Sequence, residues 1–356
     1  MLNSVGCSRA VRVADQNVET PMNFRILLAI ACVALVSAKS FTQDVQKRAE
    51  ALIDHARRLS DIRSPGAPAF RLKATFSFTG TDLDTVQGTY TEVWASDSQW
   101  RRETLVKTAK RVEVGGPSKS WLLDDTDDFP HPATHLPTLL DIFPSKSANL
   151  VFESITDYVQ SDPPAECAIT KPDARHLKSV FCFDKKSGVL LGKILPEVRL
   201  RNTVNLSRNY GSFQKFGDFW FPRQMEVRED RHKQLDVSVV ELSAEPSPDP
   251  ALFTPPPGSV ELGRCSDKLQ LPVAIFTPDT SLPFRLDDDS PVVVTLSLVV
   301  DTKGKPQSVK VLRPQHKDYE KSALSLVRVW RFKPATCNGE PMPAMINVQV
   351  DVPLSR

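Results

Sequence analysis

The residues whose type and spacing come nearest to known chemistry are His131 and His135, which follow a stretch rich in aspartate. Histidines four positions apart on a helix share one face and form a common zinc-ligand pair. Here prolines at positions 130, 132 and 137 disfavour a helix. We therefore interpret this segment, and the acidic run at 287–289, as solvated loops, and we predict no metal site.

The sequence also offers no recognisable setting for a catalytic nucleophile. It contains no Gly-x-Ser-x-Gly elbow and no glycine-rich phosphate loop, and glycine is rare in it, with 14 residues in 356. Carboxylates are plentiful, but their number does not create a pair with separate acid and base roles. We predict that the protein is not an enzyme and needs no cofactor.

Four cysteines remain after the first 38 residues, namely Cys167, Cys182, Cys265 and Cys337. Their spacings do not match a zinc knuckle. In an exported protein, four cysteines indicate disulfides, with three possible pairings. We favour Cys167–Cys182, which flanks a predicted hairpin loop, and Cys265–Cys337, since both of these lie in the C-terminal part.

Residues Met22–Ala38 have the pattern of a secretory signal, with Arg25 before an apolar run and small residues at its end. The run of about 11 residues is too short to cross a bilayer of ~30 Å as a helix. We expect export to the periplasm and cleavage of the leader, and the alternative is an uncleaved inner-membrane anchor. Because residues 1–21 lack signal character, Met22 is an alternative start to Met1.

The overall charge is nearly balanced, with 45 Lys and Arg against 43 Asp and Glu. Nucleic-acid binding depends on a clustered basic surface that releases counterions, and the sequence shows no such cluster. We therefore predict no nucleic-acid partner. At 356 residues the chain has room for two domains, each with its own core.

The N-terminal part combines one helix with many strands. Residues 43–59 carry an apolar helical stripe that ends at a Pro-Gly segment, and residues 70–79 alternate apolar with polar side chains. A short apolar helix or plug is expected at 139–143. Further strands are expected near 87–96, 99–106, 110–115, 118–123, 149–159, 178–184, 189–193, 197–206, 208–216, 224–230 and 234–243. This order predicts a strongly curved antiparallel sheet with the helix inside it.

With Gly88–Trp94 and Gln99–Glu103, the order of these elements resembles the LolA/LolB-like lipoprotein-carrier fold over about residues 43–250. The resemblance implies a half-barrel that holds acyl lipid or a lipoprotein in an apolar concavity. The alternative is a packed core. The aromatic residues concerned are Phe70, Phe76, Phe78, Tyr90, Trp94 and Trp100.

The C-terminal residues 291–352 predict two strands, an amphipathic helix and a last alternating strand. Together with the segments 299–304 and 338–341, one run in this block resembles the TonB carboxy-terminal domain. That run is Trp330, Arg331, Phe332, Lys333 and Pro334. By itself we interpret it as a packing and chain-reversal motif. The block predicts a β-β-α-β domain with the helix on one face of a three-stranded sheet.

The resemblance implies a binding edge on the last strand, because TonB domains receive a short segment of an outer-membrane receptor there. The implied residues are Met345, Ile346, Asn347, Val348, Gln349, Val350 and Asp351. An edge strand without a partner is the alternative. The expected partner is an outer-membrane receptor or another envelope protein, in transport across the outer membrane. The second hypothesis is a periplasmic lipid or lipoprotein carrier.

The sequence thus predicts an α+β chain with two domains. A proline-rich spacer at 246–264 separates them, and such segments stay extended. The full division comprises a leader at 1–38, a LolA-like half-barrel at 39–245, the spacer, and a TonB-like domain at 265–356.

Overall fold

The computed structural model divides into two compact units, Met1–Asp44 and Val45–Arg356. It describes residues 43–79, 84–126, 129–143, 150–172, 177–198, 203–265, 268–278, 292–312 and 317–352. The predicted signal at Met22–Ala38 and the acidic run at 287–289 lie outside these ranges. Within them, no helix combines the length and the apolar character needed to cross a membrane.

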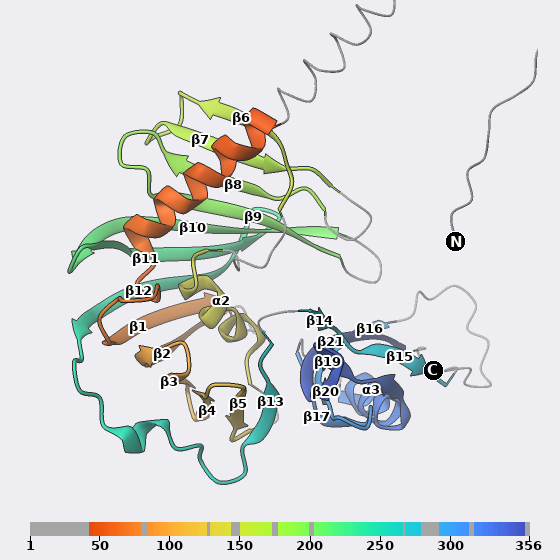
Figure 1. The fold of residues 1–356 in the computed structure, drawn as a ribbon. Coiled ribbons are helices and arrows are strands. Elements are labelled where there is room, and N and C mark those ends of the chain that lie inside the picture. Colours follow the sequence, from red (N-terminus) through yellow and green to blue (C-terminus); the bar gives the residue numbers. More distant parts are fainter. Residues whose placement is uncertain are drawn as a thin grey trace, which may run out of the picture. The chain divides into compact units, whose positions relative to one another are not determined.

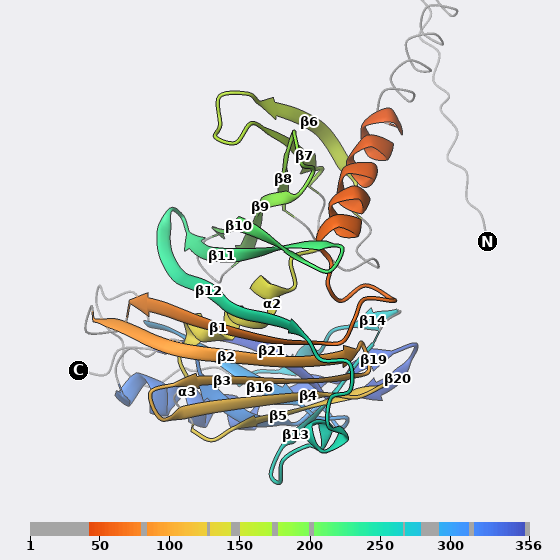
Figure 2. The ribbon, with the colours of Figure 1, turned by 90° about the vertical axis from the view of Figure 1, so that its left-hand side faces the viewer.

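The N-terminal part is dominated by one antiparallel sheet of thirteen strands, which curves strongly in both views (Figures 1 and 2). Its order is β13-β5-β4-β3-β2-β1-β12-β11-β10-β9-β8-β7-β6. The strands are β1 (Phe70–Thr79), β2 (Thr85–Ser96), β3 (Gln99–Val106), β4 (Ala109–Gly115), β5 (Lys119–Asp124), β6 (Phe152–Tyr158), β7 (Ala165–Thr170), β8 (Val180–Asp184), β9 (Leu190–Val198), β10 (Thr203–Phe216), β11 (Phe219–Glu229), β12 (His232–Ala244) and β13 (Val260–Gly263).

Two helical segments pack on the apolar face of this sheet. The first is the helix of residues 43–60, which buries Ala49, Ile53 and Ala56 in the same core as the strands. The second is α2 (Leu136–Leu140), which with the following residues forms the predicted plug. The plug side chains in this core are Leu136, Leu139, Leu140, Ile142 and Phe143. Residues 136–143 are called the plug from here on.

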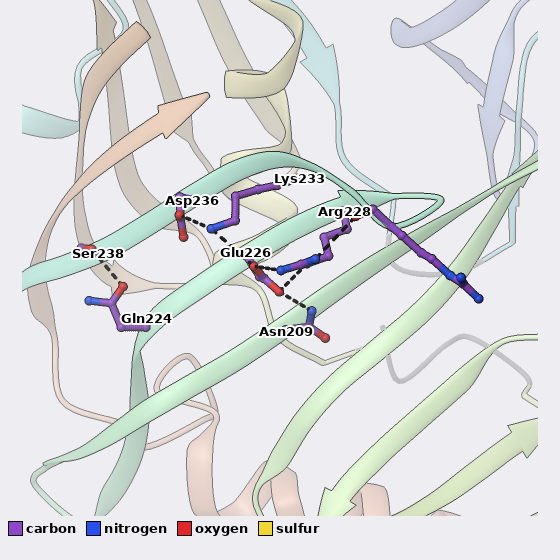
Figure 3. A network of polar contacts seen from close by, with 8 residues as sticks. Asn209, Gln224, Glu226, Arg228, Lys233, Asp236 and Ser238 are labelled. Atoms are coloured by element: carbon purple, nitrogen blue, oxygen red, sulfur yellow. Dashed lines mark hydrogen bonds and ion pairs between the residues drawn. The ribbon is translucent and has the colours of Figure 1, made fainter. Parts of the chain in front are cut away.

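The opposite face of the sheet is polar. On β10, β11 and β12, carboxylate, amide and ammonium groups bond along and across the strands (Figure 3). Glu226 accepts from Asn209 Nδ2 at 2.8 Å and from Arg228 Nε at 2.8 Å. Because side chains alternate between the faces of a strand, the neighbours of Asn209 point to the apolar side.

Several details differ from the sequence prediction. β7 was not predicted, and the two strands expected at 197–206 and 208–216 form parts of β9 and of the long β10. Residues 131–135 form a 3-10 helix, η1, although prolines were expected to prevent a helix. Proline is tolerated at the start of a helix, where its missing N–H would have no partner. β13 pairs with β5 and lies within the predicted spacer.

The C-terminal module, residues 268–352, contains the predicted β-β-α-β order. These elements are β16 (Val292–Val300), β17 (Pro306–Val311), α3 (Lys317–Val329) and β21 (Ala344–Val352). The strands form a sheet of order β17-β16-β21. Short strands accompany it, namely β14 (Leu269–Gln270), β15 (Val273–Phe276), β18 (Arg331–Lys333), β19 (Ala335–Cys337) and β20 (Glu340–Met342).

A second core, separate from the first, holds this module together. Ala323 and Val327 of α3 are buried against β16, whose Val294, Leu296 and Leu298 are fully buried. The 3.6-residue period of the helix and the 2-residue period of the strand each supply one apolar face, and burying both faces together drives the packing.

Candidate functional site

β21 is the outer strand of the C-terminal sheet. It pairs antiparallel with β16 over its whole length, from Ala344 opposite Val300 to Val352 opposite Val292, without a register shift. Among the described strands of this sheet β16 is its one neighbour. Alternate residues of an edge strand direct their N–H and C=O groups away from the sheet, so this edge offers a template for an added strand.

The side chains of β21 alternate as predicted. Val350 and Val352 are buried, and Ile346 and Val348 pack partly buried against the same core. Met345 is 45% exposed, and Asn347 is exposed while Gln349 and Asp351 are half-buried. The polar side of the strand therefore faces away from the α3 core.

The residues Trp330–Pro334 connect α3 to the short strands. Phe332 is buried in the C-terminal core, and its N–H donates to the carbonyl oxygen of Gly304 at 2.9 Å. Gly304 has a φ of +75°, and a Cβ there would lie 1.8 Å from the Phe332 carbonyl oxygen. This close approach requires glycine. The motif thus anchors the end of α3 to the turn between β16 and β17.

Both predicted cysteine pairs are disulfides in the structure. Cys167 and Cys182 lie directly opposite each other on β7 and β8. Cys265 and Cys337 are 72 residues apart in sequence and join the segment before β14 to β19. The second disulfide therefore closes most of the C-terminal module into a loop, which restricts its unfolded state.

The N-terminal core contains a buried ionic network that the sequence analysis missed. Glu92 on β2 is fully buried and forms ion pairs with Arg63 and, at 3.1 Å, with Arg102. The Tyr90 hydroxyl donates to the same carboxylate at 3.1 Å. Burial alone raises the pKa of Glu92, but the two guanidinium groups outweigh it and lower this pKa to about 2.

Two buried cations hold the backbone of the plug. Arg63 Nη1 donates to the Leu140 carbonyl oxygen at 3.0 Å. Lys193 Nζ on β9 donates to the carbonyl oxygens of Asp141 at 3.2 Å and Ile142 at 3.0 Å. These carbonyls follow the end of α2, where a helix leaves acceptors without partners of its own. The two cations therefore supply hydrogen-bond donors to carbonyl oxygens at the end of α2.

A pocket of about 580 Å³ opens beside this network. Its wall combines the aromatic rings of Trp94, Trp100 and Phe143 with guanidinium groups and with the carboxylates of Asp61, Asp97 and Asp141. The Arg102 guanidinium lies 4.3 Å from the centre of the Trp100 ring, within cation–π distance.

The six aromatic residues that the sequence offered as a cavity lining are all buried in the N-terminal core. Phe70, for example, stacks on Trp94 with ring centres 5.5 Å apart. His131 and His135 lie in η1 with their rings 4.9 Å apart. Within the described ranges, no group of three or more metal-ligating side chains is found.

Comparison with known proteins confirms the resemblance of the C-terminal residues to the TonB C-terminal domain. Residues 292–351 match the family model described as Gram-negative bacterial TonB protein C-terminal. Curated proteins gave no match to the sequence. One similar solved structure is a putative outer membrane lipoprotein-sorting protein domain from Vibrio parahaemolyticus, 12% identical, covering 58% of this chain and 97% of that chain, with a TM-score of 0.39. Another is a LolA superfamily protein from Nitrosomonas europaea, 10% identical with the same coverage and a TM-score of 0.40. The C-terminal module is thus similar in sequence to TonB C-terminal domains.

Proposed function

We propose that this protein is a non-catalytic component of the cell envelope. Its C-terminal module would bind an extended segment of an outer-membrane receptor, or of another envelope protein, by adding a strand to β21. The observation that carries the proposal is the position of β21, which is paired along nine residues with β16 and lies at the end of the sheet. The match to TonB C-terminal domains supports the same edge.

The two edges of the C-terminal sheet differ in a way that favours β21. The pairing of β17 with β16 has a register shift between Ser297 and Val299, and Ser308 on β17 has a φ of +48°. Bulges and irregular backbone protect an edge from further pairing. β21 is longer, regular and carries one charged residue, Asp351. An added peptide would therefore find a continuous row of backbone groups on β21 alone.

Photo-crosslinking in cells tests this proposal. A photoreactive residue at Asn347, exposed on β21, should give one discrete adduct with an envelope protein. The matched control places the same residue at Ser325, exposed on α3. We expect no adduct at the control position because helices do not accept added strands. Equal adducts at both positions, or none at Asn347 in a folded and exported protein, would refute strand addition.

A second function has its own observation, the pocket of about 580 Å³ beside the plug, whose wall combines aromatic rings with charged groups of both signs. It supports a periplasmic carrier that binds acyl lipid or a lipoprotein through its N-terminal part. Native mass spectrometry of the same exported protein separates the two functions. If the protein retains lipid but gives no adduct from position 347, the result favours the carrier function of the N-terminal part.

A further inference from the structure

Two buried cations face each other across neighbouring strands of the large sheet. Lys193 on β9 and Arg208 on β10 are directly paired in the antiparallel register. They are 6% and 7% exposed. Like charges opposite each other in a sheet repel, and burial strengthens the repulsion because water no longer screens it. A pairing of this kind calls for a compensating anion.

Among the described residues, two acids act on this pair from a distance, but neither pairs directly with it. Neither cation forms an ion pair with a described residue, and the hydrogen bonds of Lys193 go to neutral carbonyl oxygens. Asp141 on the plug acts electrostatically on Lys193 and on Tyr210, but its side chain is exposed. Glu197 on β9 acts on Arg208 at longer range and has other contacts. Burial, followed by the charge of Arg208, lowers the pKa of Lys193 to about 7.

Two polar atoms beside the pair have no hydrogen-bond partner among the described residues. They are Nε of Arg208 and the hydroxyl oxygen of Tyr210, both buried. Arg208 and Tyr210 are two positions apart on β10 and so lie on one face. Asn209 between them turns to the polar face and bonds to Glu226 (Figure 3). Buried polar groups normally have partners, so two orphans at one place indicate a missing acceptor.

We propose that Lys193, Arg208 and Tyr210 form a binding site for a single anionic group, a carboxylate or a phosphate. The guanidinium and the hydroxyl would donate to its oxygens, and the ammonium would neutralise its charge. The site adjoins the apolar residues of the plug, whose backbone Lys193 holds. An amphiphile with an anionic head therefore fits both surroundings. This site is independent of the β21 edge.

Isothermal titration calorimetry of the exported protein tests the site with three probes, namely inorganic phosphate, decanoate below its micelle concentration, and decanol. Binding of decanoate but not phosphate identifies an amphiphile, whereas binding of phosphate identifies a free anion. Arg208→Gln should weaken the affinity roughly 10- to 100-fold, the effect of losing a charged hydrogen bond. Arg228→Gln, on the polar face, is the matched control and should leave the affinity unchanged.

Proton uptake gives a second readout that a purely structural role would not move. An anion beside Lys193 raises the pKa of its ammonium group, so binding near pH 8 should take up a proton. Titration in two buffers of different ionisation enthalpy measures this uptake, and Lys193→Met should abolish it. If Arg208→Gln fails to fold, the affinity of Arg208→Lys for decanoate and the proton uptake of the wild type still test the site. Equal binding of decanol and decanoate, or no binding of either anion, would overturn the proposal.

Discussion

The N-terminal part and the C-terminal module have cores of different chemistry. The N-terminal core holds buried charges at Glu92, Lys193 and Arg208, together with Glu166. In the described residues of the C-terminal module, every buried side chain is apolar. The first part therefore buries some of its ionic groups, whereas no described ionic group of the second is buried.

The difference follows from what each core must cover. The large curved sheet packs on irregular segments, and the carbonyls of the plug need donors deep inside. In the C-terminal module one helix covers a three-stranded sheet, and most backbone groups in this core are satisfied within the elements themselves. A buried charge stabilises a fold only when it is paired or hydrogen-bonded. Where it is fully satisfied, it can hold an irregular segment such as the plug in one conformation. The proposed ligand site lies in the charged core and the proposed docking edge on the apolar module.

The largest effect is expected from Glu92→Gln, which removes the carboxylate between Arg63 and Arg102. Two buried guanidinium groups would then lack their counter-charge, and the free energy of unfolding should fall by about 4 kcal/mol. Chemical denaturation monitored by tryptophan fluorescence measures this loss. Glu241→Gln is the control, because Glu241 pairs with Lys73 at the surface. A similar loss in both variants would contradict a special role for burial.

The same carboxylate predicts a pH dependence. The pKa of Glu92 in the folded protein is about 2, below its ordinary value of 4.5. Its stabilising effect is therefore complete above pH 4.5 and disappears as the pH falls towards 2. The difference in stability between wild type and Glu92→Gln should shrink over this range.

Leu296→Ala tests whether the apolar core is a separate unit. Leu296 is fully buried in the C-terminal core, so its truncation should cost about 3 kcal/mol through lost burial and a cavity. Hydrogen exchange should show loss of protection in β16 and β21 and unchanged protection in the large sheet. Leu139→Ala, equally buried in the plug, should give the reverse pattern. Loss of protection across both parts in either variant would show one cooperative core.

The clean periodic elements of both parts were predictable from the sequence. β16, α3 and β21 each carry an uninterrupted apolar period, and each was predicted within a few residues. β7 was missed because it is buried on both faces, with Ala165, Glu166, Cys167 and Ala168 all buried, so it shows no alternation. The strands β18, β19 and β20 have three residues each, too few for any period to emerge.

The proposed binding edge was inferred from family resemblance, whereas the buried charges did not follow from any motif. One local signal did exist. Tyr90, Glu92 and Trp94 alternate on one face of β2, so an acid interrupts an otherwise aromatic stripe. Its partner Arg63 lies 29 residues earlier in a loop, and sequence alone does not bring such positions together. The same holds for Lys193 and the plug carbonyls.

The smallest predicted effect concerns Lys193, and it tests the charged core most specifically. Its pKa of about 7 in the folded protein lies below the ordinary value of 10.5. Between these values the unfolded chain binds a proton that the folded protein does not, so the free energy of unfolding rises with pH. From pH 7 to 9, wild type should gain about 2 kcal/mol relative to Lys193→Met. Denaturation curves at several pH values measure this gain.

The control for that test is Lys186→Met, which removes an exposed ammonium group in the turn after β8. Its stability should run parallel to that of the wild type over the same pH range, because its side chain is exposed and lies outside the buried core. If the stability of Lys193→Met also runs parallel to that of the wild type, Lys193 keeps its proton in the folded protein. The charge opposite Arg208 would then already be compensated, and the argument for a missing anion at this pair would fail.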